Sequence, residues 1–285
     1  MGESCAKLRL GRIGFLNVLP VYYPIESGII PHPFTIVAGV PSYLNDLTAK
    51  GMLDISPVSS IEYGRHAALY HIVPDLSISS FGEVKSVLLL SRCPVDRLSG
   101  KKVLVSSQSH TSAGLLKILC KLRFGVDPVF EAGSFGDCSE EGRFPDAFLA
   151  IGDEALRLAR SGLYSNILDL GTAWYEWTGL PFVYALWVLR KKTVEERNGQ
   201  VAPAISALLE SKRWGQTHIG AICEEAARAG LLGVGELEEY YRCLRFDLNE
   251  KEQKGLALFY SYLSRIGELE EVPQLDIYTP LASVA

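Results

Sequence analysis

Short apolar runs alternate with helix-like patterns along the first part of the chain. The runs KLRLGRIGF, FTIVAGV and MLDISPV have the length and composition of strands, and helical patterns follow them at residues 19–25, 41–51 and 59–70. Pro20 lies near the start of the first helix and Gly51 at the end of the second, which are positions that these residue types favour. This strand–helix alternation predicts a mostly parallel sheet with helices on its faces.

The alternation restarts in the middle of the chain and gives way to helices at the end. SVLLLS is an uninterrupted apolar run, strand–loop–helix units follow at residues 98–125 and 147–162, and FVYALWVLR has the pattern of another buried strand. From Thr193 onward the pattern is almost entirely helical, and the chain then ends in an extended segment. The predicted helices span Val201–Glu210, Thr217–Ala229, Glu236–Leu244 and Asn249–Arg265.

Two long apolar strands, at about residues 84–92 and 182–190, bracket the middle unit. We interpret them as crossovers between two α/β lobes. Residues 1–90 together with 190–285 form the first lobe, and residues 91–189 form the second. One continuous α/β domain is the alternative, because a buried central strand has the same pattern as a crossover strand.

The composition is that of a globular protein and excludes two classes of partner. Of the 285 residues, 48% are hydrophobic and 21% are charged, and the net charge is −5. Nucleic acid is not expected as a partner, because phosphate binding needs a basic face and the basic residues are dispersed. No apolar run reaches the ~18 residues of a membrane span, and the N-terminus lacks the pattern of a signal peptide. We therefore expect a cytoplasmic protein that does not bind a membrane.

The sequence indicates neither a cofactor nor a metal. Its six cysteines form no C-x-x-C pair, and no histidine lies near them at the spacing of metal ligands. The sequence also lacks the G-x-G-x-x-G of dinucleotide-binding proteins and the P-loop. We therefore expect the protein to work without a bound cofactor.

Three clusters of hydroxyl side chains predict a pocket for a small anion. Hydroxyl groups and the free backbone N–H groups at helix starts are common partners of carboxylates. Each cluster alone is explained by a helix cap or a turn, but three in one chain favour a carboxylate-bearing ligand. The clusters are DISPVSSIEY with Ser56, Ser59 and Ser60, LSISS with Ser77, Ser79 and Ser80, and SQSHTS at residues 107–112.

SQSHTS gives the strongest of these signals. Ser109, Thr111 and Ser112 directly precede the helical pattern AGLLKIL. A helix start combines partial positive charge with free N–H donors, so added hydroxyls suit it to a carboxylate. His110 in the same cluster is either a general base or a surface residue, and the sequence offers no orienting partner for it.

Several motifs, taken in order, resemble a known enzyme family. GRIGFLNVLPVYY, GVPSYLNDL, GMLDISPVSSIEYGR, LSISSFGEVKSVLLLSR, SSQSHTSAGLLKIL, AIGDEAL and WYEWTGLPFVYALWV cover about residues 8–190. As a set they resemble the chorismate dehydratases of the futalosine route to menaquinone. The resemblance implies an α/β fold similar to type II periplasmic-binding-protein folds, with two lobes and a ligand cleft between them. It also implies that the substrate is the small molecule chorismate, which loses water to give 3-[(1-carboxyvinyl)oxy]benzoate.

The resemblance also gives roles to individual residues. By residue type alone Asn17 in GFLN is a turn or cap residue, but the resemblance implies that it faces the substrate and matters for catalysis. It likewise implies that Ser79 and Ser80 lie at the cleft wall. For Gly152 in IGDEA we expect a backbone contact with the substrate. A carboxylate at the neighbouring Asp153 would repel a dianion unless it were protonated or paired.

The shortage of side-chain bases leads to a hypothesis about mechanism. The enolpyruvyl carboxylate of the substrate takes the ring proton, and the protein orients the substrate. Two alternatives stay open at this point. One is the sister enzyme 1,4-dihydroxy-6-naphthoate synthase, which depends on a histidine in its second lobe; this chain has none between Phe144 and Val183. The other is a small-anion binding protein of the same fold.

Overall fold

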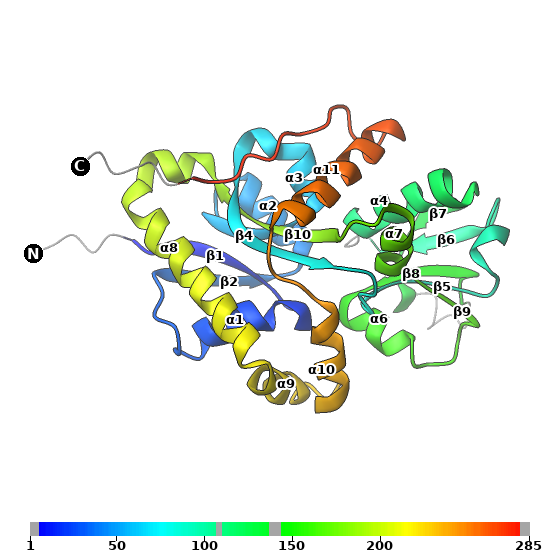
Figure 1. The fold of residues 1–285 in the computed structure, drawn as a ribbon, viewed down its shortest axis with the longest axis horizontal. Helices are drawn as coiled ribbons and strands as arrows, with labels where there is room; N and C mark the ends of the chain where they lie inside the picture. The colour runs from blue at the N-terminus through cyan, green and yellow to red at the C-terminus, as the bar shows by residue number, and fades with distance from the viewer. Residues whose placement is uncertain (1–5, 107–109, 137–143, 280–285) are drawn as a thin grey trace, which may run out of the picture.

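Two five-stranded sheets, each flanked by helices, organise the chain into two lobes (Figure 1). The computed structural model describes residues 6–106, 110–136 and 144–279. The strand order is β2-β1-β3-β10-β4 in the first sheet and β7-β6-β8-β5-β9 in the second. Both sheets are mixed, because β10 runs antiparallel to its neighbours in the first and β5 does so in the second. The prediction of a mostly parallel sheet is therefore corrected to two mixed ones.

The first sheet is formed by the N-terminal strands and by β10, which comes from much later in the chain. Its strands are β1 (Leu8–Ile13), β2 (Phe34–Gly39), β3 (Ile55–Ser59), β4 (Tyr70–Ser80) and β10 (Phe182–Arg190). The helices between them are η1 (Leu16–Val18), α1 (Leu19–Glu26), α2 (Pro41–Ala49) and α3 (Ser60–His66), with a short η2 (Ala67–Leu69) before β4.

The second sheet is built from the middle of the chain. Its strands are β5 (Val87–Ser91), β6 (Lys102–Val105), β7 (Val129–Ala132), β8 (Ala147–Ile151) and β9 (Asn166–Asp169). Its helical segments are η3 (Val95–Arg97), α4 (His110–Ile118), η4 (Leu119–Phe124), α6 (Gly152–Leu158) and α7 (Leu170–Thr178).

The proline in DISPVSS lies inside a strand rather than at a strand end. Strand β3 continues through Pro57 to Ser59, one residue beyond the predicted run MLDISPV, and leads directly into α3. A proline has no N–H to give to a sheet. Here β3 pairs with β1 only at Ile55, whereas its pairing with β10 extends to Ser59, so the β1 side needs no donor from Pro57.

Sheet membership shows where the chain passes between the lobes. β5 pairs within the second sheet and β10 within the first, so the two passages are the short connections 81–86 and 179–181. The sequence-based boundaries of 90/91 and 189/190 fall near the ends of β5 and β10. We therefore propose lobe boundaries in the two connections. β5 and β10 look alike in sequence because both are almost wholly buried.

The C-terminal helices pack against the first lobe and extend to the junction with the second (Figure 1). They are α8 (Lys191–Thr217), α9 (Ile219–Ala227), α10 (Val234–Cys243) and α11 (Glu250–Arg265). The extended tail returns to β4, where Ile277 forms a bridge with Ile72. Within the described ranges, none of the helices has the length and apolarity needed to cross a bilayer.

Candidate functional site

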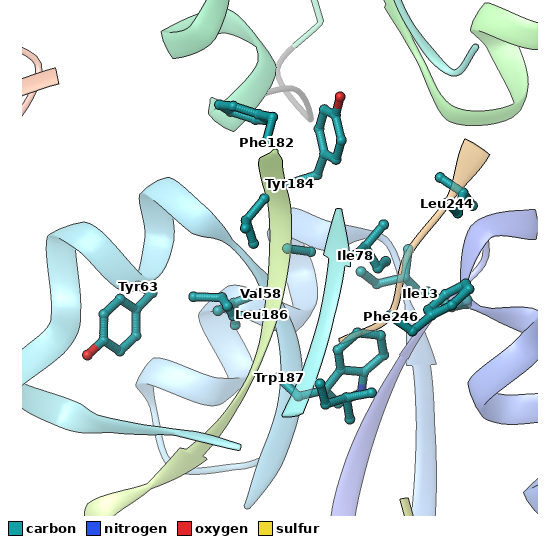
Figure 2. Packing of buried hydrophobic residues seen from close by; sticks show 14 of the residues in the cluster. Ile13, Val58, Tyr63, Ile78, Phe182, Tyr184, Leu186, Trp187, Leu244 and Phe246 are labelled. Atoms are coloured by element: carbon teal, nitrogen blue, oxygen red, sulfur yellow. The ribbon is translucent and has the colours of Figure 1, made fainter. Parts of the chain in front are cut away.

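A cleft lies between the two lobes, close to both passages of the chain. The space within it is about 690 Å³, a figure that includes solvent at the open mouth. Figure 2 shows several of its apolar side chains, among them Ile13, Ile78 and Leu244. The described residues that line it are Ile13, Phe15, Asn17, Pro41, Ser59, Ile78, Val84, Ser86, Val87, Thr111, Ser112, Ile151, Gly152, Tyr184, Ala185 and Leu244.

Asn17 lies on η1, the single helical turn between β1 and α1, and its side chain lines the cleft. Helix α1 begins at Leu19 directly after this turn, and Pro20 is its second residue, where a proline fits the first helical turn. The Oδ1 atom of Asn17 is buried and has no hydrogen-bond partner among the described residues. A buried amide oxygen without a partner costs stability, so this acceptor is available to a ligand that carries a donor.

The starts of α3 and α4 bring two of the predicted hydroxyl clusters together across the cleft. Ser59 is the N-cap of α3 and its hydroxyl accepts a hydrogen bond from the Glu62 N–H. The Thr111 hydroxyl, in the first turn of α4, accepts from the Ile61 N–H at 3.0 Å. Ser112 lines the cleft beside Thr111. Both hydroxyls keep their own protons for donation, so they can serve an anion while holding the start of α3.

Gly152 lines the cleft from the second lobe, at the start of α6. Its φ of 57° is in the left-handed region, and a Cβ there would lie 3.2 Å from the ring of Phe15. Its N–H donates to the Ser86 carbonyl at 2.7 Å, so this N–H is engaged within the protein. The structure thus places Gly152 at the cleft, as a point where the backbone of the second lobe meets Phe15 of the first.

Three other predicted residues are buried but do not line the cleft. Ser56 faces Gly11 of the neighbouring strand β1. Ser79 is buried without a partner for its hydroxyl among the described residues. Ser80 bonds to the Gly82 carbonyl at 2.8 Å and to the Tyr184 hydroxyl at 3.1 Å. Ser80 therefore supports a cleft residue, whereas the other two pack inside the first lobe.

Three further polar side chains, of His110, Arg12 and Arg65, do not line the cleft. Ser109 lies outside the described residues, and His110 is exposed at the start of α4. Arg12 forms an ion pair with Glu26 at 3.0 Å, and Arg65 is exposed. Neither arginine is among the lining residues.

Two polar lining residues were not singled out as ligand contacts by the sequence. Ser86 is the last residue of the first passage between the lobes, and its hydroxyl bonds to Tyr240 of α10 at 3.1 Å. Tyr184 lies at the end of β10 that faces the second lobe (Figure 2). A lone serine before an apolar strand and a tyrosine inside one carry no distinctive sequence signal. Their place in the cleft lining becomes apparent only when the two lobes are seen together.

Few ionisable side chains line the cleft. Its described lining has no carboxylate, amine, guanidinium or imidazole group. Tyr184 is its one titratable side chain, and burial raises the Tyr184 pKa well above the usual value. Nearby Asp153 accepts a hydrogen bond from the Leu16 N–H at 3.2 Å. Burial raises the Asp153 pKa, and this hydrogen bond opposes the increase.

The described residues contain no group of three or more His, Cys, Asp or Glu side chains that could hold a metal ion. The cleft therefore presents hydroxyls, one amide and an apolar wall. Such a set can orient an anion and exclude water.

Comparison with known proteins adds a family match. The chain matches the family described as menaquinone biosynthesis over residues 8–265. It is 30% identical over 267 residues to a chorismate dehydratase of Thermus thermophilus, covering 88% of this chain and 93% of that protein. It is 31% identical over 180 residues to a chorismate dehydratase of Campylobacter jejuni, covering 61% of this chain and 64% of that protein.

Solved structures establish the fold. A protein of Archaeoglobus fulgidus superposes with a TM-score of 0.76 at 18% identity, covering 94% of this chain and all of that one (100%). The alkanesulfonate-binding protein SsuA of Xanthomonas axonopodis superposes with a TM-score of 0.69 at 15% identity, covering 97% of both chains. The expected two-lobed α/β fold of the periplasmic-binding-protein type is confirmed.

Proposed function

The chain belongs to the menaquinone biosynthesis family, and from this premise we propose that it is a chorismate dehydratase. The reaction removes water from chorismate and gives 3-[(1-carboxyvinyl)oxy]benzoate. A ring C–H bond and the neighbouring C–O bond break, a ring double bond forms, and the proton and hydroxide leave together as water. Because the product ring is aromatic, much of the driving force resides in the substrate.

The observation that carries this proposal is the character of the cleft. It brings the unpaired amide oxygen of Asn17 to the same cavity as the hydroxyls of Ser59, Thr111 and Ser112. Chorismate carries two carboxylates and a hydroxyl, so it offers acceptors for the protein hydroxyls and a donor for the amide. Helix starts at α3 and α4 supply partial positive charge without a cationic side chain.

The cleft lining supports a reaction in which the substrate supplies its own base. Apart from Tyr184, whose pKa is raised by burial, the described lining has no group that titrates. A tyrosine with a raised pKa is a poor proton acceptor near neutral pH. In our proposal the enolpyruvyl carboxylate takes the ring proton, because it is tethered next to the C–H bond that breaks.

In this mechanism the protein orients the substrate and excludes water. Asn17 is proposed to hold the departing hydroxyl or the enolpyruvyl group through its amide, which is neutral and does not act as a base near neutral pH. Ser59, Thr111 and Ser112 are proposed to hold the carboxylates. The apolar wall strengthens these polar contacts by keeping water out and holds the reactive conformer.

Replacement of Asn17 by alanine tests the role of the amide. We expect Asn17→Ala to lower kcat by ~100-fold, the scale of losing one oriented polar group at a reacting centre. The matched control is Asn166→Ala, which removes an amide on β9 that bonds to Ser165 away from the cleft. Chorismate loss and product formation are followed by chromatography. Full activity in purified, folded Asn17→Ala would exclude the role proposed for Asn17.

The same assay separates the alternatives. A receptor of this fold would bind chorismate without releasing a product. A 1,4-dihydroxy-6-naphthoate-forming enzyme would leave chorismate unchanged. Either result with the unmodified protein would exclude the proposed reaction.

A further inference from the structure

The backbone of Leu16, the residue next to Asn17, is held from two directions. Its N–H donates to Oδ1 of Asp153 at 3.2 Å, and its carbonyl accepts from the hydroxyl of Tyr241 at 2.9 Å. Asp153 belongs to α6 of the second lobe, whereas Tyr241 belongs to α10 among the C-terminal helices. Two side chains from distant parts of the chain therefore fix one peptide unit on either side of Leu16.

The packing around this turn is tight. Phe15, the other neighbour of Leu16, lies so close to Gly152 that a Cβ at Gly152 would be 3.2 Å from its ring. The Tyr241 side chain is buried, and its neighbour Tyr240 bonds to the hydroxyl of Ser86 at 3.1 Å. Figure 1 shows α10 beside α6 at the junction of the lobes. Helix α10 thus contacts the two cleft segments that carry Asn17 and Ser86.

We propose that Asp153 and Tyr241 are positioning residues that hold the turn carrying Asn17 in its working place when the two lobes meet. This inference rests on the proposed dehydratase function. Asp153 is not among the residues that line the cleft, and its Oδ1 already accepts the Leu16 N–H. Its contribution is therefore a hydrogen-bond acceptor and not a proton-transfer group.

The bond between Asp153 and Leu16 joins one lobe to the other. It can form only where the start of α6 approaches η1, so the position of the second lobe is transmitted to the residue beside Asn17. Substrate that contacts both lobes would stabilise this bond. Since a displacement of ~1 Å at a reacting group can cost ~100-fold in rate, loss of the bond should reduce the chemical step more than substrate binding.

Two substitutions at Asp153 distinguish positioning from acid–base chemistry. Asparagine keeps an oxygen that can accept the Leu16 N–H but has no titrating proton, whereas alanine keeps neither. We expect Asp153→Ala to lower kcat by ~10-fold or more with KM changed less than ~3-fold, and Asp153→Asn to retain most of the activity. Tyr241→Phe, which removes only the hydroxyl, should lower kcat in the same way.

Glu154→Ala is the matched control, because Glu154 lies in the same first turn of α6 and, among the described residues, pairs only with Arg157, at 4.0 Å. Its activity should equal that of the unmodified protein. Thermal melting of every variant separates loss of folding from loss of positioning, and Asp153→Asn and Tyr241→Phe remain decisive if Asp153→Ala does not fold.

Three results would overturn the inference. Native kcat in folded Asp153→Ala is one, and an Asp153→Asn as inactive as the alanine variant is another, since it would indicate proton transfer. Native kcat in Tyr241→Phe would remove Tyr241 from the proposal. Absence of chorismate turnover by the unmodified protein is a separate outcome, which would exclude the dehydratase function and this inference with it.

Discussion

Asp54 is an almost fully buried carboxylate, 3% exposed, directly before β3. It accepts hydrogen bonds from the backbone and side chain of Arg9 at 2.8 and 3.0 Å, and from Thr193 at 3.1 Å. Arg197 adds an ion pair at 3.3 Å. Burial by itself raises the Asp54 pKa, but the bonds from Arg9 and Thr193 outweigh it and the net pKa lies below 3.8. Asp54 therefore ties β1 and β3 to the first turns of α8.

The lowered pKa of Asp54 determines how its contribution to the stability of the protein depends on pH. A carboxylate whose pKa is lower in the folded state stabilises the protein above its unfolded pKa and loses that effect as pH falls through the folded value. We expect Asp54→Asn to reduce the free energy of unfolding by ~1–3 kcal/mol at pH 7. The difference from the unmodified protein should shrink as the pH falls below 3.8.

Denaturant unfolding at several pH values measures this effect. Asp46→Asn, at an exposed position of α2, should change stability by less than ~0.5 kcal/mol. A loss for Asp54→Asn that is the same at pH 7 and pH 3 would contradict the electrostatic account.

At the residue scale, the sequence predicts which side chains are polar but not which way they point. Successive residues of a strand face opposite sides of the sheet. Ile78 of β4 lines the cleft, so Ser77 on one side of it faces away and bonds to the Asp247 carbonyl. The hydroxyl cluster LSISS was therefore recognisable, whereas its orientation depended on pairing with β10 and with residue 245.

Helix packing depends on close approaches that only glycine permits. Gly215 of α8 lies against α1, and a Cβ there would be 1.9 Å from the Pro20 carbonyl oxygen. Because that neighbour is backbone, it has little freedom to move. α1 leads directly from η1, so this contact also fixes the helix behind the turn that carries Asn17.

Two glycine-to-alanine substitutions in the same helix should therefore have opposite effects. Alanine favours a helix over glycine by ~1 kcal/mol, and at Gly199 a Cβ would meet nothing within 4 Å. Gly199→Ala should be neutral or stabilising, whereas Gly215→Ala should destabilise by ~1–3 kcal/mol through overpacking. Thermal melting measures both. A Gly215→Ala protein as stable as Gly199→Ala would contradict the packing described here.

At the element scale, most helices and strands could be predicted, but their partners could not. The apolar run 182–190 was recognisable as a buried strand, and its place between β3 and β4 was not. The local pattern of apolar and polar residues determines whether a segment is a helix or a strand. Pairing between strands more than 100 residues apart depends on how the whole chain folds. The strand through Pro57 was predicted from MLDISPV, whereas the reason that the sheet tolerates this proline depends on where β1 stops pairing.

The whole molecule is a pair of lobes that meet around the cleft. Thr111 and Asp153 of the second lobe bond to backbone N–H groups of the first. On the outside, Arg160 pairs with Glu236 at 2.9 Å and Lys85 with Glu239 at 3.3 Å. These exposed pairs contribute little individually, so a ligand that contacts both walls should add substantially to the cohesion of the lobes.

Ligand binding should therefore stabilise the whole molecule. At a free concentration 100 times its Kd, the product 3-[(1-carboxyvinyl)oxy]benzoate should add ~2.7 kcal/mol to the free energy of unfolding. Thermal melting with increasing product measures this. Benzoate, which lacks the enolpyruvyl carboxylate, is the control and should raise Tm less. A Tm that does not respond to the product at millimolar concentration would contradict binding between the lobes.

Two-lobed architecture followed from the sequence because the family motifs extend across both lobes. The contacts of α10 with the cleft could not be predicted from the sequence, because Tyr240 and Tyr241 lie in a segment with the pattern of an ordinary amphipathic helix. Their hydroxyls acquire a role only where α10 meets η1 and the first passage between the lobes.

Product formation from chorismate tests the central claim most directly. Purified protein is incubated with chorismate without added metal or cofactor, and the mixture is resolved by chromatography with mass detection. We expect chorismate to disappear as one equivalent of 3-[(1-carboxyvinyl)oxy]benzoate, lighter by one water, accumulates, with the rate proportional to protein concentration. Chorismate that stays intact, or that forms only its uncatalysed rearrangement product, would contradict the account.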